Sequence, residues 1–372
     1  MRIAIVLNSS WNIYNFRKGL VQTLLREGHQ VLAIAPKDEY SEKLEEWGCK
    51  YVDVKMDNKG TNPIKDFYYL YQLWTIFKKE KPDIVLQFTI KPNIFGAMAA
   101  ALCGIPAVNN VCGLGTTFLQ KHWTSTIAQW LYKVSFRFPQ KVYFQNVDDL
   151  SVFIENRLVD KNISDLLPGS GVSLQEFQPQ PFQRNPQFTF LMLSRLITDK
   201  GVREFAEAGH ILKQKGINAK LLLVGSYDPN DYLRIPQKEL ELWQKEQWIE
   251  YVGSAKDVKP YINQADCIVL PSYREGTPRS LLEAASMAKP LIATRVAGCR
   301  QTIDDGQNGY LCEVKNAHDL AQKMMQMYAL SDEELTLMGE KSRKKAEKQF
   351  DEKIVVHSYL KTIQEICAPL QK

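Results

Sequence analysis

Short apolar segments alternate with amphipathic segments along most of this chain. Residues 3–7 and 31–35 are uninterrupted apolar runs, which fit strands that are buried on both faces. Between them, residues 17–27 have the apolar spacing of a helix, and Gly28 follows at the position where many helices end. Neighbouring parallel strands need a crossover connection, which is usually a helix. The alternation therefore predicts an α/β protein with parallel sheets.

The alternation occurs twice, before and after a polar connector at residues 167–187. Before the connector, further strands are predicted at 50–54, 83–88, 107–111 and 141–145, and helices at 39–47, 65–79 and 93–102. After it, strands are predicted at 188–193, 219–224, 248–252, 267–270 and 291–293, and helices at 202–214, 236–247, 257–264, 278–287, 331–348 and 351–366.

Two doubly wound, Rossmann-like domains follow from this pattern. A chain of 372 residues is long enough to bury two such cores. The predicted domains are residues 1–168 and 169–350, and we expect the last helix, in 351–372, to pack back on the first domain. The first turn, from Asn8 to Asn15, is predicted to be a loop without the G-x-G-x-x-G motif. Its absence counts against a nicotinamide or flavin enzyme.

The cysteines and the amino terminus favour the cytosol. No cysteine pair has C-x-x-C spacing and no Cys/His cluster has metal-ligand spacing, which argues against structural zinc. Only five apolar residues follow Met1-Arg2, which is too short for a signal-peptide core. The seven cysteines are scattered, at Cys49, Cys103, Cys112, Cys267, Cys299, Cys312 and Cys367.

Positive charge is concentrated in one region. From Ile84 to Val147 the chain has no Asp or Glu and five basic residues, which equals the net charge of +5. Within it, the segment from Phe118 to Phe138 interleaves basic and aromatic residues, a mixture that suits an anionic membrane surface. A core helix with a few solvated lysines is the alternative. Nucleic acid is not expected as a partner, because no binding motif accompanies the charge, and residues 94–108, the most apolar stretch, are shorter than a spanning helix of about 20 residues.

The stretch from Pro271 to Glu283 carries the clearest chemical signal. It follows the predicted strand 267–270, and Gly276, Thr277 as N-cap and Pro278 predict a helix start that attracts anions. Glu275 and Glu283 are eight positions apart, and each carboxylate can grip a vicinal diol. A diphosphate between two diols describes a nucleotide sugar. The alternative is that Glu283 pairs with Arg279 on an exposed helix face.

Two cations follow another predicted strand. Arg195 and Lys200 come after residues 188–193, at a strand end where open α/β sheets bind ligands. A guanidinium bridges two phosphate oxygens, a lysine adds a compact charge, and together they stabilise a departing diphosphate. Gly169 and Gly171 let backbone amides approach the same phosphates, although linker glycines also serve flexibility.

These elements together resemble the retaining family 4 glycosyltransferases, over almost the whole chain. The resemblance rests on Gly169-Ser-Gly-Val, Arg195 with Lys200-Gly201, Glu275-Gly276 with Glu283, and residues 289–293. It implies the GT-B fold, with the nucleotide-sugar site in the cleft between two facing domains. The opening Met1-Arg-Ile, the Asn15-Phe-Arg17 element and residues 37–40 resemble the subgroup that acts on undecaprenyl-diphosphate-linked sugars. This subgroup includes an N-acetylgalactosaminyltransferase of bacterial protein N-glycosylation and enzymes of capsule and O-antigen assembly.

The resemblance implies a role for each matching residue. Arg195 and Lys200 hold the donor diphosphate, Glu275 the hydroxyls of the donor sugar, and Glu283 the ribose diol. The remaining substrate-binding residues implied in this way are Asn15, Arg17, Gly171, Tyr251, Val252, Gly253, Gly276, Thr277, Pro278, Arg279 and Ser280. Two departures from the family pattern, Cys112 where a His is frequent and Gln301 where a Glu is frequent, leave a general base and one donor contact unassigned.

The expected reaction is retaining transfer of an N-acetylhexosamine such as GalNAc from a UDP-sugar to a lipid-linked saccharide at the cytoplasmic face of the inner membrane. The leaving phosphate takes the acceptor proton, and no metal or other cofactor is expected because two cations neutralise the diphosphate. A glycoside hydrolase using Glu275 and Glu283 is disfavoured, since eight helical positions span about 12 Å and such carboxylates lie about 5–9.5 Å apart. The sequence also allows an epimerase or phosphorylase on the same fold, and a non-catalytic nucleotide-sugar-binding protein.

Overall fold

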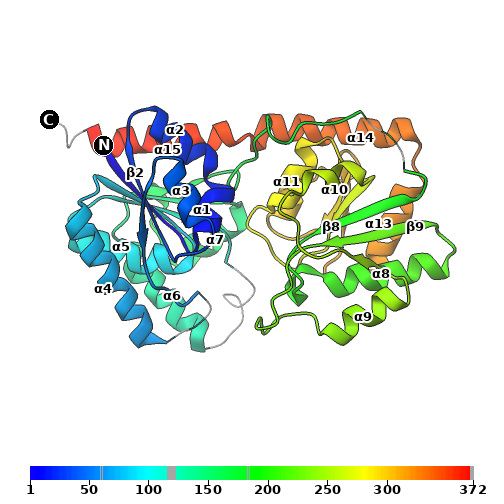
Figure 1. The fold of residues 1–372 in the computed structure, drawn as a ribbon, viewed down its shortest axis with the longest axis horizontal. Helices are drawn as coiled ribbons and strands as arrows, with labels where there is room; N and C mark the ends of the chain where they lie inside the picture. Colours follow the sequence, from blue (N-terminus) through cyan, green and yellow to red (C-terminus); the bar gives the residue numbers. More distant parts are fainter. Residues whose placement is uncertain (59, 61, 115–122, 182, 184, 369–372) are drawn as a thin grey trace. The chain divides into compact units, whose positions relative to one another are not determined.

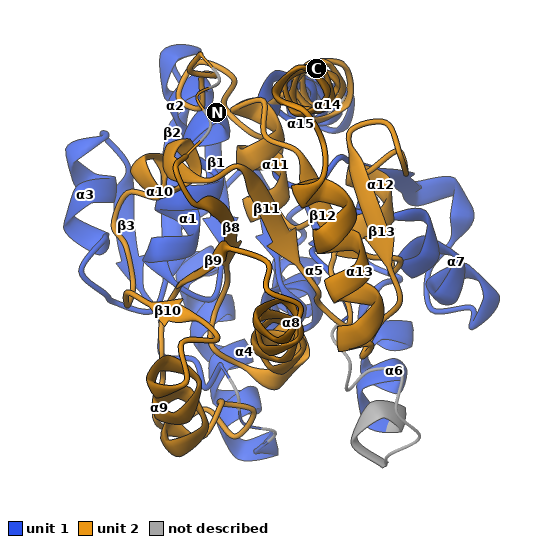
Figure 2. Ribbon diagram, turned by 90° about the vertical axis from the view of Figure 1, so that its right-hand side faces the viewer, with its two compact units in different colours: residues 1–170, 352–372 blue, residues 171–351 orange. Residues whose placement is uncertain are grey.

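The computed structural model describes residues 1–58, 60, 62–114, 123–181, 183 and 185–368 (Figure 1). The chain divides into two compact units, which Figure 2 distinguishes by colour. Unit 1 comprises Met1–Ser170 with Glu352–Lys372, and unit 2 comprises Gly171–Asp351. The first division therefore falls at residue 170, where the sequence suggested 168.

Unit 1 is built on a seven-stranded parallel sheet with the order β3-β2-β1-β4-β5-β6-β7. Its first strand, β1, pairs on one side with β2 and on the other with β4. The predicted parallel α/β architecture is confirmed. The strands are β1 (Arg2–Val6), β2 (Gln30–Ala35), β3 (Lys50–Asp53), β4 (Ile84–Phe88), β5 (Ala107–Val111), β6 (Lys141–Phe144) and β7 (Ser164–Leu166).

The two faces of this sheet build two separate cores. Ile3 and Ile5 point into one core and Ala4 and Val6 into the other, as the two-residue period of a strand requires. The first core contains α2 (Lys18–Arg26) and the carboxyl-terminal α15 (Glu352–Cys367), and α1 (Ser10–Phe16) and α3 (Ser41–Glu46) each add one fully buried side chain to it. The second is covered by α4 (Pro63–Glu80), the π-helical turn η1 (Pro92–Gly96), α5 (Ala97–Leu102), α6 (Trp123–Ser135) and α7 (Val147–Glu155).

The segment after β1 is helical, so the loop predicted from Asn8 to Asn15 is wrong. Helix α1 begins at Ser10 because the Ser9 side chain accepts a hydrogen bond from the Asn12 amide at 3.1 Å, a typical N-cap. The polar composition of the segment suggested a loop, whereas its serine is a helix start signal. Residues 30–35 then return to the sheet beside β1.

Helix α15 belongs to unit 1, although it ends the chain. Its Val355, Tyr359 and Ile363 are buried in the first core. The Tyr359 hydroxyl accepts a hydrogen bond from the Asn110 amide at 2.8 Å, and the Thr362 hydroxyl lies 2.6 Å from that of Tyr143. The end of the chain is therefore tied to β5 and β6 by polar and apolar contacts.

Unit 2 repeats the architecture with a six-stranded parallel sheet, in the order β10-β9-β8-β11-β12-β13. Its strands are β8 (Phe188–Leu193), β9 (Ala219–Val224), β10 (Glu250–Tyr251), β11 (Cys267–Leu270), β12 (Leu291–Thr294) and β13 (Gly309–Cys312). Helices α8 (Val202–Gln214), α9 (Gln237–Lys245) and α13 (Ala317–Tyr328) cover one face, and α10 (Lys259–Gln264), α11 (Arg279–Ser286) and the turn η5 (Ala346–Phe350) cover the other. Helix α14 (Asp332–Lys345) begins with a capping box formed by Ser331 and Glu334.

The basic and aromatic segment from Phe118 to Phe138 divides between core and surface. Residues 118–122 lie outside the described part of the chain. Tyr132 in α6 and Phe136, the first residue after it, are buried in the second core of unit 1, as the core-helix interpretation expected. Trp130 is exposed, however, and so is Phe138 just beyond the helix. Among the described residues, no helix has the length and apolar content needed to span a bilayer.

Candidate functional site

Three loops of unit 2 follow the adjacent strands β8, β11 and β12. All three strands are parallel, so these loops leave the sheet at the same edge. The carboxyl edge of an open parallel sheet is where ligands bind in α/β proteins. The predicted residues Arg195, Lys200 and Glu275 lie on two of these loops, on neighbouring strands.

The loops after β8 and β11 are locked together through their backbones. The Asp199 carbonyl accepts hydrogen bonds from the Tyr273 amide at 2.9 Å and the Ser272 hydroxyl at 3.1 Å. Gly201 has φ of 75°, and a Cβ there would lie 2.0 Å from the Pro271 carbonyl oxygen. Only glycine fits this position, since another residue would meet rigid backbone in an unfavourable conformation.

This locking brings Lys200 and Glu275 into direct contact. The Lys200 Nζ lies 2.5 Å from Glu275 Oε1, and the two side chains are only 21% and 11% exposed. Their contact joins two loops that are 75 positions apart in sequence. A partly buried ion pair of this kind fixes the positions of the ammonium and the carboxylate. Their remaining hydrogen-bonding atoms can still contact a polar ligand.

Arg195 lies at the same edge but is not part of that pair. It is exposed and makes no side-chain hydrogen bond or ion pair with any residue that the structure describes. The backbone before it is fixed, because a Cβ on Gly225 would lie 1.6 Å from the Ser194 carbonyl oxygen. The backbone next to Arg195 is therefore fixed, while its guanidinium can bind a ligand.

The third loop, after β12, packs against Glu275 through another glycine. Gly298 has φ of 77°, and a Cβ there would lie 2.2 Å from the Gly276 carbonyl oxygen. Burial raises the pKa of the neighbouring Cys299 thiol well above its usual value; the Glu275 carboxylate adds to this and the Lys200 ammonium opposes it. Cys299 is thus a neutral neighbour of the Lys200–Glu275 pair.

Helix α11 begins one residue later than predicted. It runs from Arg279 to Ser286, and its N-cap is Pro278, whose ψ of 114° is extended and which offers no side-chain cap. The prediction of a helix over residues 278–287 with Thr277 as N-cap is therefore wrong in detail. Only Gly276, Thr277 and Pro278 separate Glu275 from the first residue of α11, so the helix still starts shortly after the carboxylate.

Glu283 pairs with Arg279 inside α11. Arg279 Nε donates to Glu283 Oε1 at 2.9 Å, and a second guanidinium nitrogen donates to the Gly171 carbonyl at 3.4 Å. The two side chains are 18% and 13% exposed, so the alternative of an exposed surface pair is wrong in its exposure. Burial raises the pKa of Glu283, and the charge and hydrogen bond of Arg279 counteract this.

The end of β10 is held in place by its own backbone bonds. The Val252 amide donates to the Leu223 carbonyl at 3.1 Å, and the Gly253 carbonyl accepts from the Gly225 amide at 2.9 Å. The Tyr251 hydroxyl donates to the Gly225 carbonyl at 3.0 Å. Val252 is itself exposed. These backbone bonds hold residues 251–253, which were predicted to bind substrate, in a fixed position.

In unit 1, Arg17 and Asn15 lie at the end of α1. The Arg17 side chain is almost fully buried, at 4% exposure, and stacks over the Phe88 ring at 4.2 Å. Its guanidinium contacts the Cys112 sulfur at 3.6 Å and the Phe16 carbonyl at 3.4 Å, and no described carboxylate pairs with it. Its Nε has no partner among the described groups. The Asn15 amide donates to the Trp11 carbonyl at 2.9 Å, which keeps it in its own helix.

Sequence reasoning missed several residues that position the site. Asp199 and Ser272 connect two loops through backbone and hydroxyl groups, and no motif marks them. Gly225 follows strand β9 directly, and a glycine at a strand exit is a signal that could have indicated close backbone approach. Among the described residues, no group of three His, Cys, Asp or Glu side chains is arranged to hold a metal ion.

Two Rossmann-like units in one chain, one of them carrying a lysine–carboxylate pair and an arginine unpaired among the described residues at the ends of its strands, define the GT-B fold class. Comparison with solved structures agrees. Anabaena HepE in complex with UDP superposes with a TM-score of 0.78 at 17% identity, covering 98% of this chain and all of that one, which shows the fold.

Sequence comparison then gives the family. The model of glycosyl transferases group 1 matches residues 175–345, and the glycosyl transferase 4-like model matches residues 2–146. The N,N'-diacetylbacillosaminyl-diphospho-undecaprenol alpha-1,3-N-acetylgalactosaminyltransferase of Campylobacter jejuni is 30% identical over 97% of this chain and 98% of its own length. The UDP-Gal:alpha-D-GlcNAc-diphosphoundecaprenol alpha-1,3-galactosyltransferase of Escherichia coli is 26% identical over 76% and 75%. The chain belongs to the family 4 (group 1) glycosyltransferases, as its motifs predicted.

Proposed function

We propose that this glycosyltransferase moves an N-acetylhexosamine, with GalNAc as the first candidate, from a UDP-sugar to an undecaprenyl-diphosphate-linked saccharide. The names of the Campylobacter jejuni and Escherichia coli relatives support a diphosphoundecaprenol-linked acceptor. A UDP-sugar in the second name and bound UDP in the HepE structure support the donor. The observation that carries the proposal is the Lys200–Glu275 pair at the ligand-binding edge of a GT-B unit.

The donor is proposed to bind unit 2 through groups of complementary charge. Arg195 has an unengaged guanidinium that can bind two diphosphate oxygens, and Lys200 adds a second cation. Glu275 accepts hydrogen bonds from the sugar hydroxyls while its other oxygen holds Lys200. Glu283 binds the ribose diol, positioned by Arg279. The backbone at Gly276, Thr277, Pro278 and Ser280 faces the phosphates, and Gly171 and residues 251–253 complete the donor site.

The proposed reaction proceeds with retention of configuration. The bond between the anomeric carbon and the diphosphate oxygen breaks, and positive charge develops on the sugar ring while negative charge develops on the phosphate. The acceptor hydroxyl forms the new bond from the same face, and its proton passes to the departing phosphate. Arg195 and Lys200 stabilise this phosphate most strongly when its charge is largest, which is the condition for lowering the barrier.

A transfer assay tests the function directly. Purified enzyme is incubated with a panel of UDP-hexoses and UDP-N-acetylhexosamines and an undecaprenyl-diphosphate-linked saccharide, and the product linkage is read by NMR. We expect a single α-linked product, with an N-acetylhexosamine as the best donor. Sugar released to water without acceptor supports a hydrolase instead, and an isomerised nucleotide sugar supports an epimerase.

We propose that the two cations make a metal ion unnecessary. Preincubation with EDTA, followed by removal of the chelator–metal complex, is therefore expected to leave the transfer rate unchanged. Added Mg²⁺ or Mn²⁺ is expected to change it by less than about twofold, because Arg195 and Lys200 already supply the counter-charge that a metal provides elsewhere. Loss of activity in EDTA that Mn²⁺ restores contradicts the proposal.

We also propose that Arg17 binds an anionic group of the acceptor. A buried guanidinium without a carboxylate costs several kcal/mol, of which stacking on Phe88 offsets about 2 kcal/mol. The Arg17→Met variant is therefore expected to melt at or above the wild-type temperature, while the KM for the lipid-linked acceptor rises about tenfold or more and the KM for the UDP-sugar stays the same. A large drop in melting temperature with an unchanged acceptor KM identifies Arg17 as purely structural.

The enzyme is proposed to act in the cytoplasm, at the inner face of the membrane that contains such an acceptor. The exposed Trp130 and Phe138, near the basic Lys133 and Arg137, support contact of the segment from Phe118 to Phe138 with the membrane surface. The buried Tyr132 and Phe136 limit this contact to the outer side of α6.

A further inference from the structure

Helix α4 of unit 1 has an apolar face that no described part of unit 1 covers. Ile64, Phe67, Tyr68 and Tyr71 are between 51% and 80% exposed. They recur at intervals of three and four residues, so they form one stripe along two turns of the helix. Tyr69, Leu73 and Phe77 form the opposite stripe and are fully buried. The outer stripe therefore does not contribute to the core, and an exposed cluster of this kind indicates an interaction surface.

Further apolar side chains are exposed on the neighbouring helices of the same layer. Helices α4, α5 and α6 all pack on the second core of unit 1, and both ribbon views place α4 and α6 on the same side of its sheet (Figures 1 and 2). Leu102 at the end of α5 and Ile127 and Trp130 on α6 are exposed as well. We call the seven residues the aromatic face: Ile64, Phe67, Tyr68, Tyr71, Leu102, Ile127 and Trp130.

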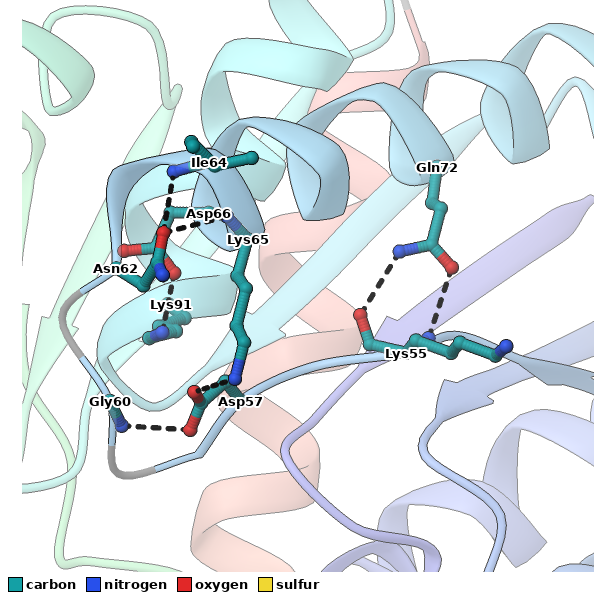
Figure 3. A network of polar contacts seen from close by, with 9 residues as sticks. All are labelled: Lys55, Asp57, Gly60, Asn62, Ile64, Lys65, Asp66, Gln72 and Lys91. Atoms are coloured by element: carbon teal, nitrogen blue, oxygen red, sulfur yellow. Dashed lines mark hydrogen bonds and ion pairs between the residues drawn. The ribbon is translucent and has the colours of Figure 1, made fainter.

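Ion pairs neutralise the acidic residues of α4. Asp66 pairs with Lys91, and Glu80 pairs with Lys50 at 2.6 Å. Asp57, in the loop before the helix, pairs with Lys65 at 3.0 Å, as Figure 3 shows. Helices α5 and α6 contain no Asp or Glu. No unpaired carboxylate of these helices therefore opposes an anionic partner.

Exposed cations lie beside the aromatic face. Lys78 and Lys79 end α4, and Lys133 and Arg137 lie at the end of α6 and just beyond it. The Lys78 ammonium stacks over the Trp74 ring at 4.0 Å, so part of this charge is already held next to an aromatic side chain. Aromatic rings at headgroup level with basic residues beside them are typical of helices that lie in a membrane interface.

The amino end of α4 is built to present this face rigidly. Asn62 caps the helix through hydrogen bonds from the Ile64 and Lys65 amides at 3.0 and 3.4 Å, and Gln72 exchanges two hydrogen bonds with the Lys55 backbone (Figure 3). A helix that is fixed on its inner side loses little conformational entropy when its outer side binds.

We propose that the aromatic face docks the enzyme onto an anionic lipid bilayer, with α4 lying in the headgroup region. The proposal rests on the proposed function, because that function places the acceptor in a membrane. A second copy of the chain is a poorer partner: an isologous dimer through this face would bring two sets of lysines together without carboxylates to compensate them. Each basic residue near an anionic surface instead adds favourable energy.

Vesicle flotation tests the face without any activity measurement. The full chain is mixed with phosphatidylcholine vesicles that contain phosphatidylglycerol, or with phosphatidylcholine alone. We expect the wild type to float with the anionic vesicles and the triple variant Phe67→Ser, Tyr71→Ser, Trp130→Ser to bind them about tenfold or more weakly. The matched control, Tyr232→Ser with Leu242→Ser, removes two exposed side chains of unit 2 and is expected to float like the wild type.

The charge is tested separately by Lys78→Glu with Lys79→Glu. This variant is expected to bind anionic vesicles more weakly than the wild type. The loss should be larger the more strongly added salt weakens wild-type binding, because salt screens the same attraction between lysines and lipid headgroups. Equal flotation of wild type and triple variant overturns the proposal. The proposal is also overturned if the wild type is dimeric in solution and the triple variant is monomeric. That result identifies the aromatic face as a contact between two copies of the chain.

Activity with two acceptors separates this proposal from the proposed function. We expect the triple variant to match the wild type on a water-soluble acceptor with a short prenyl chain and to lose about tenfold or more on the undecaprenyl acceptor embedded in vesicles. A wild type that transfers to neither acceptor contradicts the proposed function, whatever its flotation. A triple variant that is as active as the wild type on the vesicle-embedded acceptor contradicts the docking role alone.

Discussion

Replacing Lys200 with alanine is expected to lower kcat about 10²–10³-fold, and also to lower the unfolding temperature, because the mostly buried Glu275 carboxylate loses its partner. The ammonium is proposed to face the phosphate on which charge builds during bond breaking, so its loss raises the barrier more than it weakens substrate binding. The measurement is initial-rate kinetics with the best UDP-sugar, together with the affinity for UDP from a thermal-shift titration. UDP is expected to bind more weakly to the variant, since one of two cations is lost.

A second lysine–glutamate pair in unit 2 supplies the control. Lys220 lies 2.8 Å from Glu250, and both are more exposed than the Lys200–Glu275 pair. Exposed pairs contribute about 0–1 kcal/mol to stability, so Lys220→Ala is expected to leave both kcat and UDP affinity unchanged. Wild-type turnover in Lys200→Ala, or an equal loss in both variants, contradicts the assignment of Lys200.

The fold was predictable because its strands are buried on both faces. The run 267–270 is apolar throughout and 188–193 is apolar except for Thr189, and the structure has strands over the same residues. Strand β13 and helix α13 were missed. Strand β13, Gly309–Cys312, begins with a glycine, a residue depleted in strands, so it lacks the continuous apolar run that marks the strand of equal length at 267–270. Local sequence is enough to predict a strand where burial on both faces requires apolar residues. It is not enough for short strands at the edge of a sheet, where burial is less complete.

The residue types of the site were predictable, but their pairing was not. Arg195, Lys200 and Glu275 follow strand signals that can be read locally. The contact between Lys200 and Glu275 depends on Gly201 fitting against Pro271 and on the bonds of Asp199 to the next loop. These are contacts between distant segments, which sequence spacing does not contain.

The outer stripe of α4 shows a different limit. The helix was predicted at 65–79 and begins two residues earlier, at Pro63, because Asn62 caps it. The sequence has apolar residues on two sides of this helix, and periodicity alone does not say which side is buried. Only the packing of Tyr69, Leu73 and Phe77 on the sheet identifies Phe67 and Tyr71 as the exposed side.

The Glu275→Gln variant is expected to change UDP binding in the opposite direction from Lys200→Ala. The carboxylate is proposed to hold the sugar hydroxyls and to position Lys200 through their 2.5 Å contact. Its amide replacement keeps the shape but removes the negative charge beside the diphosphate, so UDP is expected to bind as tightly as to the wild type or more tightly. Turnover is nevertheless expected to fall about 10²-fold or more, because sugar and ammonium are no longer held in the reactive geometry.

The two variants are distinguished by the direction in which the affinity for UDP changes. Replacing a residue that merely supports the fold would lower the affinity for UDP, the turnover and the melting temperature together. The control variant Glu250→Gln measures the effect of losing an exposed ion pair. If Glu275→Gln binds UDP less tightly in step with Lys200→Ala, the carboxylate contributes to the nucleotide site or to folding, and its proposed contact with the donor sugar is wrong. If the affinity for UDP is unchanged while turnover falls, the two partners of the ion pair have different roles. Glu275 then binds the donor sugar, and Lys200 binds the diphosphate.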